Sequence, residues 1–467
     1  MGSGAVTLSQ DVPDDGCCIE QEFTEFGLIV EAEDSLDMPN LHIHDAAIVT
    51  MDNDFTLIDD GAIVSADGRL IYVGPQAGAP APRAEDQIID AAGMVAIPGL
   101  INAHTHLAMT LFRGAADDLP LMTWLQEKIW PVEARLTPED VYWASLLGIA
   151  EMLRAGVTTF HDMYWHVEAV ADAVRESGIR AGLSGVVIGV IPGAEAMLEQ
   201  AIERVRALVK EGHPRIIPFF GPHAPYTVPK PMMQRVVEAA AEIGVGIHTH
   251  LSETRSEVAE CLREHGTTPI ALMNQIGLFT VPVTAAHCVH PTEEEIPILA
   301  ECKVGVAHCP SSNMKLGSGI APVPAYLDAD VIVGLGTDGA GSNNTLDILR
   351  EVRGAALLHK VHGDPTAIAA SEALFMATRG GAAAMRQPDL GSLEIGKIAD
   401  IALLNFQQPH LAPRGRIISD LVYAAYASDV DTVIVHGKVL MRGRQLLTLD
   451  EARIRAKVNE SAQRLFG

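Results

Sequence analysis

The sequence predicts an α/β protein, a (β/α)8 TIM barrel with a small β-sandwich domain formed by the N- and C-terminal segments. From Gly99 onward, eight short apolar runs alternate with longer stretches that have the periodicity of amphipathic helices. Strands that alternate with helices form parallel sheets, and eight such units close into a barrel. On either side of this region the chain consists of short β-rich runs separated by turn signals, so we expect the two ends to form one small domain.

The eight apolar runs are the expected barrel strands. In chain order they read LINAHTHL, GVTTFHDM, RAGLSGVVI, RIIPFFGPHAPY, VGIHTHLSE, VTAAHCVH, KVGVAHCP and VIVGLGTDG. Between them lie stretches such as PEDVYWASLLGIAEMLRAG and PKPMMQRVVEAAAEIG, whose apolar residues recur at helical spacing. The region therefore predicts repeated strand–helix units.

The rest of the chain divides by composition. Residues 1–40 are acidic, contain no Lys or Arg and show no sustained periodicity, which predicts a disordered or loosely docked arm. The next segment carries a hairpin signal at Asp67-Gly68, between two alternating runs. We expect the small β domain over 41–98 and 391–445, the barrel over 99–390 and a C-terminal helix over 446–467.

Composition limits the partners and the compartment. The formal charge of −27 would repel a phosphate backbone, so we expect no nucleic-acid partner. No run reaches the ~20 apolar residues of a membrane span, and the first residues lack the features of a secretory signal. The six cysteines show no CxxC spacing, which is typical of free thiols in the cytoplasm. Barrels of this kind commonly associate, so a homo-oligomer is among the expected states.

Polar residues stand where the expected barrel strands end, and most of them are histidines. Barrel enzymes carry their chemistry at these strand ends. Packing alone does not explain a histidine at the mouth of nearly every strand. The residues at these positions are His104, His106, His161, Asp162, His223, His250, His287, His308 and Asp338.

The first run contains the most informative pair. His104 and His106 are two residues apart and so project from the same face of a strand, where two imidazoles can bind one metal ion at ~2.0–2.1 Å. The pattern is weak alone and occurs twice more. The His42-Ile43-His44 pattern lies in the small domain without a supporting cluster. In the fifth run, His248 shares a face with His250 and is expected deeper, as a core residue or a support for the ligands.

Together these residues predict a site for one divalent ion. Three imidazoles and one carboxylate, from His104, His106, His250 and Asp338, leave a position for water, and a bound metal lowers the pKa of that water toward ~7. Asp338 and His287 can take the proton, and Glu253 can shuttle it to the substrate. The alternative for Asp338 is a structural aspartate in a glycine-rich turn. We expect Zn2+, with Fe2+, Mn2+ and Ni2+ as alternatives.

The ordered motifs PGLINAHTHLAMTLFRG, GPHAPYTVP, HTHLSET, AAHCVH and GLGTDGAGSNN resemble the amidohydrolase superfamily from about Leu41 to Arg444. The chain is most similar to the branch of 5′-methylthioadenosine/S-adenosylhomocysteine deaminases and triazine chlorohydrolases. The resemblance implies that His104, His106, His250 and Asp338 are metal ligands and that Glu253, His287 and Asp338 carry protons. Many members bridge two metals with a carboxylated lysine at the end of strand four. The fourth run here has no lysine, which favours one metal.

The same resemblance implies the substrate contacts. His223 matches a substrate-binding histidine, and Glu253 and Asp338 also face the substrate. Glu133 falls where the deaminases bind the ribose hydroxyls, and Trp124 where an aromatic residue walls the pocket. A carboxylate can accept hydrogen bonds from two vicinal hydroxyls, although an exposed loop acid is the alternative. Arginines that bind the substrate tail fall in a region without a clear alignment, near Arg175, Arg180, Arg204 and Arg206.

We therefore expect a hydrolytic deaminase of adenosine-type nucleosides, with 5′-methylthioadenosine, S-adenosylhomocysteine or adenosine as the small-molecule substrate. The products would be the inosine analogue and ammonia. The alternative is a deaminase or chlorohydrolase of a free ring such as guanine, a pterin or an s-triazine. A metal-free barrel acting as an assembly scaffold is a third hypothesis, which the intact ligand set disfavours.

Overall fold

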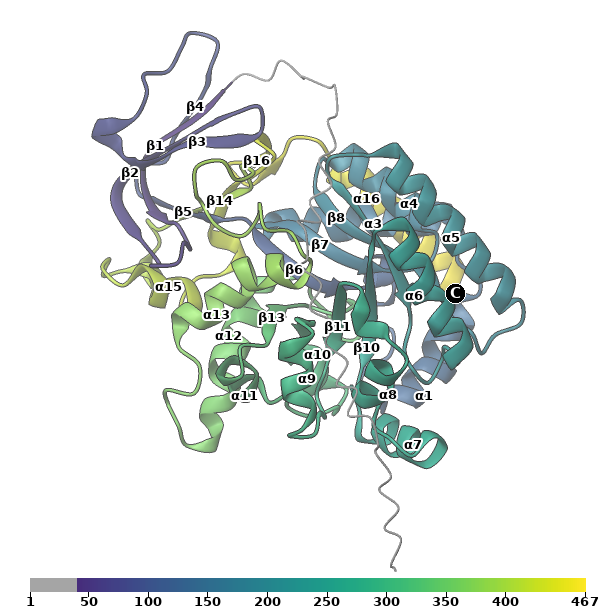
Figure 1. Cartoon of the computed structure of the whole chain (residues 1–467). Coiled ribbons are helices and arrows are strands. Elements are labelled where there is room, and N and C mark those ends of the chain that lie inside the picture. The colour runs from purple at the N-terminus through teal and green to yellow at the C-terminus, as the bar shows by residue number, and fades with distance from the viewer. Residues whose placement is uncertain (1–39) are drawn as a thin grey trace, which may run out of the picture.

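The computed structural model describes residues 40–467, so the expected acidic arm lies outside the described residues except for Asn40. Within the described part, an eight-stranded parallel sheet surrounded by helices lies beside a separate mixed sheet (Figure 1). The predicted barrel and the small β domain built from both chain ends are confirmed.

The barrel strands pair in chain order, and each pair is parallel. The ring closes where the Asp338 amide, after the last strand, donates to the His104 carbonyl oxygen at 3.0 Å. Every residue of the first two strands is buried, as expected for a sheet covered on both faces. The eight strands of the described barrel are β6 (Leu100–Thr105), β7 (Val157–Met163), β8 (Arg180–Val187), β9 (Ile216–Pro222), β10 (Gly246–Leu251), β11 (Val283–His287), β12 (Gly305–His308) and β13 (Ile332–Leu335).

Helices follow the strands and cover the outside of the barrel (Figure 1). The first long one begins with a capping box, in which Thr137 and Asp140 bond each other's backbone amides. The helices are α3 (Pro138–Arg154), α4 (Val167–Ser177), α5 (Ala194–Glu211), α6 (Lys230–Ile243), α7 (Arg255–His265), α8 (Pro269–Gln275), α9 (Glu295–Glu301), α10 (Pro310–Lys315), α11 (Val323–Asp328), α12 (Ile348–Leu358), α13 (Ala370–Phe375) and α14 (Gly381–Ala384).

The loop after β6 carries an additional helical segment over the mouth of the barrel. It consists of α1 (Leu121–Thr123), a π-helical stretch (Trp124–Ile129) and α2 (Trp130–Glu133). Trp124, Leu125 and Ile129 are buried, so this segment presents an apolar side to the interior. The loop thereby brings Trp124 and Glu133 to the same end of the barrel as the strand-end histidines.

The small domain is one mixed sheet of nine strands within the described residues. β5 pairs antiparallel with β14, which joins the two ends of the chain. The Asp67-Gly68 signal is a two-residue hairpin turn with φ values of 50° and 74°, as its sequence predicted. The strands are β1 (Leu41–Val49), β2 (Leu57–Ala66), β3 (Arg69–Pro75), β4 (Gln87–Asp90), β5 (Met94–Pro98), β14 (Ile401–Asn405), β15 (Val430–Val435), β16 (Lys438–Arg442) and β17 (Gln445–Leu446).

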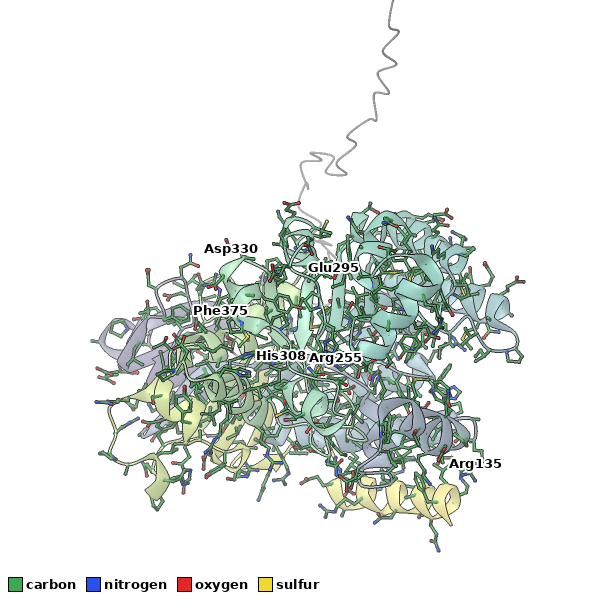
Figure 2. The ribbon with its side chains drawn as sticks, turned by 90° about the horizontal axis from the view of Figure 1, so that it is seen from below. Arg135, Arg255, Glu295, His308, Asp330 and Phe375 are labelled. Atoms are coloured by element: carbon green, nitrogen blue, oxygen red, sulfur yellow. The ribbon has the colours of Figure 1, made fainter. Side chains whose placement is uncertain are left out.

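After the short α15 (Ile417–Tyr423) and the last strands, the terminal helix α16 (Glu451–Phe466) returns to the barrel. Arg154 on α3 holds Glu451 through two bonds of 2.7 and 2.6 Å. Arg135, beside α16 in Figure 2, donates to the Leu465 carbonyl oxygen at 2.5 Å. None of the described helices is long and apolar enough to cross a membrane.

Candidate active site

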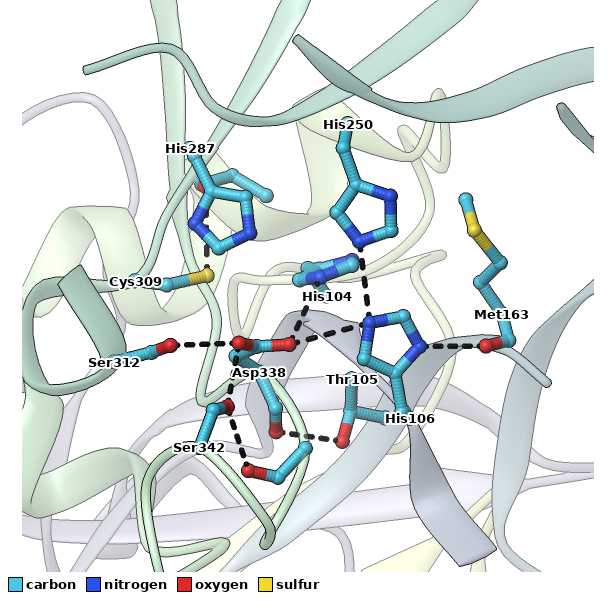
Figure 3. A network of polar contacts seen from close by, with 12 residues as sticks. His104, Thr105, His106, Met163, His250, His287, Cys309, Ser312, Asp338 and Ser342 are labelled. Carbon is cyan, nitrogen blue, oxygen red and sulfur yellow. Dashed lines mark hydrogen bonds and ion pairs between the residues drawn. The ribbon is translucent and has the colours of Figure 1, made fainter. Parts of the chain in front are cut away.

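The predicted ligands converge at the carboxyl ends of their strands (Figure 3). His104 lies in β6, His106 directly after it, His250 in β10, and Asp338 just after β13. The Nε2 atoms of His104 and His106 each lie 3.3 Å from Asp338 Oδ1. The Nε2 atoms of His106 and His250 are 3.1 Å apart. Four side chains from distant parts of the sequence therefore point at one place.

Each imidazole is held in its orientation by a contact at Nδ1, the ring nitrogen on the side away from the cluster. His106 Nδ1 donates to the Met163 carbonyl oxygen at 2.6 Å, and His250 Nδ1 donates to the His223 carbonyl oxygen at 2.7 Å. A carbonyl only accepts, so the proton is on Nδ1 and both Nε2 lone pairs face the centre. His104 Nδ1 contacts His248 Nε2 at 2.8 Å, which places His248 behind the cluster.

This arrangement fits a divalent cation. Two Nε2 lone pairs facing each other repel unless a cation lies between them. His104 Nε2 and Asp338 Oδ1 are buried and have no hydrogen-bond partner within the described residues, although both face the cluster. Buried polar atoms without a partner are costly, and a shared metal ion would satisfy them.

Asp338 is held in one orientation. Its Oδ2 accepts hydrogen bonds of 2.6 Å from Ser312 and from Ser342, which leaves Oδ1 toward the histidines. Burial raises the pKa of Asp338, but the close contact with His104 and the neighbouring imidazoles outweigh it and hold this pKa well below its ordinary value. The residue has φ of 60°, a left-handed conformation that is strained for a non-glycine residue. A plain turn aspartate does not require this set of contacts.

Glu253 and His287 lie beside the ligands. Their closest polar atoms, Oε2 and Nε2, are 4.0 Å apart, and His287 Nδ1 donates to Asn313 Oδ1 at 2.8 Å. Burial raises the pKa of Glu253. For His287, burial acts to lower the pKa, but the carboxylates of Glu253 and Asp338 outweigh it and raise the pKa. The carboxyl group and the imidazole are thus both shifted toward their protonated forms, as groups that hold and exchange a proton require.

One cavity joins this cluster to the predicted substrate contacts. Of the predicted site residues, His104 is fully buried beneath the others. The remaining ones line the cavity together: His106, Trp124, Glu133, His223, His250, Glu253, His287 and Asp338. Burial raises the pKa of Glu133, while Tyr164 and Trp165 beside it act in the opposite direction.

Several supporting residues were missed by the sequence analysis. Glu257 accepts from the amides of Ser252 and Glu253 at 2.9 and 2.7 Å, and so holds the bend that carries the Glu253 side chain. Its spacing of four from Glu253 was a weak signal. Ser312 and Asn313 lie in the stretch SSNMKLGSG, whose first part is the short helix α10. Their polarity is typical of many surface loops and does not by itself identify their contacts with Asp338 and His287.

Other sequence candidates lie outside the cluster. His42 contacts Asp86 at 3.0 Å and His44 contacts Asp45 at 2.6 Å, both in the small domain. The four arginines considered for a substrate tail are paired with acidic residues on the barrel exterior or toward the small domain. The pairs are Arg175 with Glu211, Arg180 with Asp400, Arg204 with Glu168, and Arg206 with Glu242.

Comparison with known proteins agrees with this geometry. Residues 95–440, which span the barrel and most of the small domain's second part, match the model of the amidohydrolase family. The chain belongs to the amidohydrolase family. Its predicted membership is thereby confirmed, and with it the assignment to metal-dependent hydrolases.

Similar amidohydrolases include two curated relatives named 5-methylthioadenosine/S-adenosylhomocysteine deaminase. The protein from Pelotomaculum thermopropionicum is 51% identical over 429 residues, covering 92% of this chain and 99% of the relative. The protein from Moorella thermoacetica is 52% identical over 425 residues, covering 91% and 99%.

Solved amidohydrolase structures show the same fold. An adenosine deaminase from Xanthomonas campestris with bound zinc has a TM-score of 0.87 and 36% identity, covering 92% of this chain and 99% of that chain. An atrazine chlorohydrolase from Arthrobacter aurescens TC1 complexed with zinc has a TM-score of 0.84 and 26% identity, covering 90% and 100%.

Proposed function

We propose that this amidohydrolase deaminates adenosine-type nucleosides by hydrolysis, giving the inosine analogue and ammonia. The observation that carries the proposal is the shared cavity. Its lining includes side chains whose nitrogen and oxygen atoms converge closely enough for a metal ion, together with Glu253, His287 and the Glu133 carboxylate, and this combination supports the proposal. The names of the relatives at about 50% identity support the same substrate class.

We assign the metal site to His104, His106, His250 and Asp338, and zinc is the ion that this donor set and the zinc-containing neighbours favour. When bound, a divalent ion there lowers the pKa of water and so supplies the nucleophile at neutral pH. Asp338 and His287 accept the two protons of the attacking water in turn. Glu253, whose pKa burial raises, passes these protons on, the first to the ring nitrogen and the second to the leaving amine, so that each carrier returns to its starting state.

The ribose and the ring of the substrate are held by residues away from the metal-binding end of the cavity. Glu133 accepts hydrogen bonds from the two ribose hydroxyls, and Trp124 packs against the nucleoside as part of the cavity wall. His223 lies between the metal-binding end and the wall formed by Tyr226, and contacts the purine. Because these contacts hold the ring carbon in a fixed position relative to the attacking water, they lower the activation free energy of the reaction.

The decisive experiment is an assay of ammonia release and ultraviolet change with methylthioadenosine, adenosine, guanine and a chlorotriazine. We expect conversion of the adenosine compounds to inosine-type products. Turnover of only a free ring would retain the metal chemistry and overturn the nucleoside assignment, in favour of the chemistry of the chlorohydrolase neighbour. Purified protein without a bound metal ion and without activity would instead support a scaffold.

The Glu133→Ala variant tests the ribose contact. We expect KM for adenosine compounds to rise about 10- to 100-fold with little change in kcat, because two charge-assisted hydrogen bonds are lost. Steady-state kinetics with a 2′,3′-dideoxy analogue provide the comparison, since the wild type and the variant should treat that compound alike. Glu127→Ala, an exposed acid on the same segment, is the matched control. An unchanged preference for ribosides would remove Glu133 from the site.

A further inference from the structure

The cavity has an unusual charge pattern for a site that would hold an amino-acid tail. Its lining includes three carboxylates, from Glu133, Glu253 and Asp338, and no Lys or Arg of the described residues. Away from the metal-binding end the wall is apolar, with Leu121 and Leu125 from the helical segment, Val186 and Ile188 from the end of β8, and Leu316 after α10.

Two basic side chains that are close in sequence to lining residues are engaged elsewhere. Arg135, two residues after Glu133, donates to the Leu465 carbonyl oxygen on α16 (Figure 2). Lys315, which precedes the lining residue Leu316, forms an ion pair of 2.7 Å with Asp117 and donates to the Gly341 carbonyl oxygen at 3.2 Å. Residues 1–39, which the structure does not describe, contain no Lys or Arg in their sequence.

These observations bear on the 5′ substituent of a nucleoside, and so rest on the proposed function. An uncharged thioether would find the apolar surface that it prefers. An α-carboxylate would lose its hydration, find no cation in the described lining and lie in the same cavity as three acidic side chains. This holds whichever wall the substituent faces.

We propose that the cavity discriminates between adenosine nucleosides by the charge of the 5′ substituent, accepting a thioalkyl group and rejecting one that bears a carboxylate. The chain is then a deaminase of methylthioadenosine-like nucleosides, and a nucleoside whose 5′ substituent carries a net negative charge is a poor substrate. Val186 and Ile188 form the part of this apolar wall that lies at the end of β8, where a cation can be introduced to test the inference.

The test compares kcat/KM for 5′-methylthioadenosine with that for two longer compounds of matched length, 5′-butylthioadenosine and 5′-(3-carboxypropyl)thioadenosine. We expect kcat/KM for the butyl compound to lie within about 10-fold of that for methylthioadenosine. We expect kcat/KM for the carboxylate compound to be lower by about 100-fold or more. Carboxylate turnover within 10-fold of the butyl compound would overturn the inference. Equal loss with the butyl compound would also overturn it, because size rather than charge would then decide.

A gain-of-function variant gives an independent test. Ile188→Arg supplies a cation at the half-buried wall, and we expect it to raise kcat/KM for the carboxylate compound at least 10-fold. Ile188→Met is the matched control and should not. A wild-type metal content and thermal unfolding transition show that the variant is folded; if it is not, Val186→Lys takes its place. No gain in either folded variant would contradict the inference. Inactivity of the wild type on all the adenosine compounds would instead refute the proposed function.

Discussion

His106→Ala is expected to lose the bound metal and the activity together. His106 Nε2 lies 3.3 Å from Asp338 Oδ1 and 3.1 Å from His250 Nε2, so its imidazole contacts both neighbours at the centre of the cluster. Without it, the remaining donors bind a divalent ion much more weakly. We expect the metal content to fall from about one ion per chain toward none, and kcat to fall by about 10⁴-fold or more. Elemental analysis of the purified protein and an ammonia-release assay measure the two quantities.

The control for this variant comes from the same sequence pattern. His44 belongs to a His-x-His pair in the small domain and contacts Asp45 rather than the barrel cluster. His44→Ala should therefore keep both metal and activity. A metal content that is unchanged in His106→Ala, or that falls in His44→Ala, would show that the ion is bound elsewhere.

Glu253→Gln is expected to separate metal binding from turnover. The carboxyl group stands 4.0 Å from His287 Nε2 and is not among the groups whose ligand atoms converge for a metal. Glutamine preserves the shape but cannot donate and accept a proton in turn. We expect one metal ion per chain, nearly unchanged KM and a fall in kcat of about 10²- to 10⁴-fold.

Metal analysis together with steady-state kinetics on methylthioadenosine measures these effects. Glu260→Gln, an exposed acid on α7 paired with Arg263, is the matched control and should behave as the wild type. Loss of metal in proportion to activity would show that Glu253 acts as a ligand. A wild-type kcat would show that the proton travels by another route.

The barrel and the convergence of the candidate ligands were predictable because both depend on patterns that the sequence displays. Apolar runs that alternate with helical stretches predicted eight barrel strands. Because the carboxyl ends of parallel barrel strands meet at one face, the sequence also predicted that His104 and His250 lie close together. The same logic did not reach Ser312 and Ser342. These residues act through hydrogen bonds to Asp338, whose geometry depends on how two loops fold over each other.

The substrate side was harder to predict for a related reason. The four arginines considered for the substrate tail have side chains that can bind a carboxylate. However, residue type does not reveal the direction in which a side chain points. Arg180 shows this plainly, since it lies in β8 and pairs with Asp400 of the small domain at 3.2 Å. Only the structure shows that the cavity is left without such a group among the described residues.

The pairing of β5 with β14 has a consequence for the order in which the protein folds. These adjacent strands flank the whole barrel in sequence, with Pro98 opposite Ile401. During synthesis, β1 to β5 leave the ribosome first and must wait with an unpaired edge until the barrel has been translated. Such an edge is a site for intermolecular strand addition. Chains truncated before Ile401 should therefore aggregate even when every active-site residue is present.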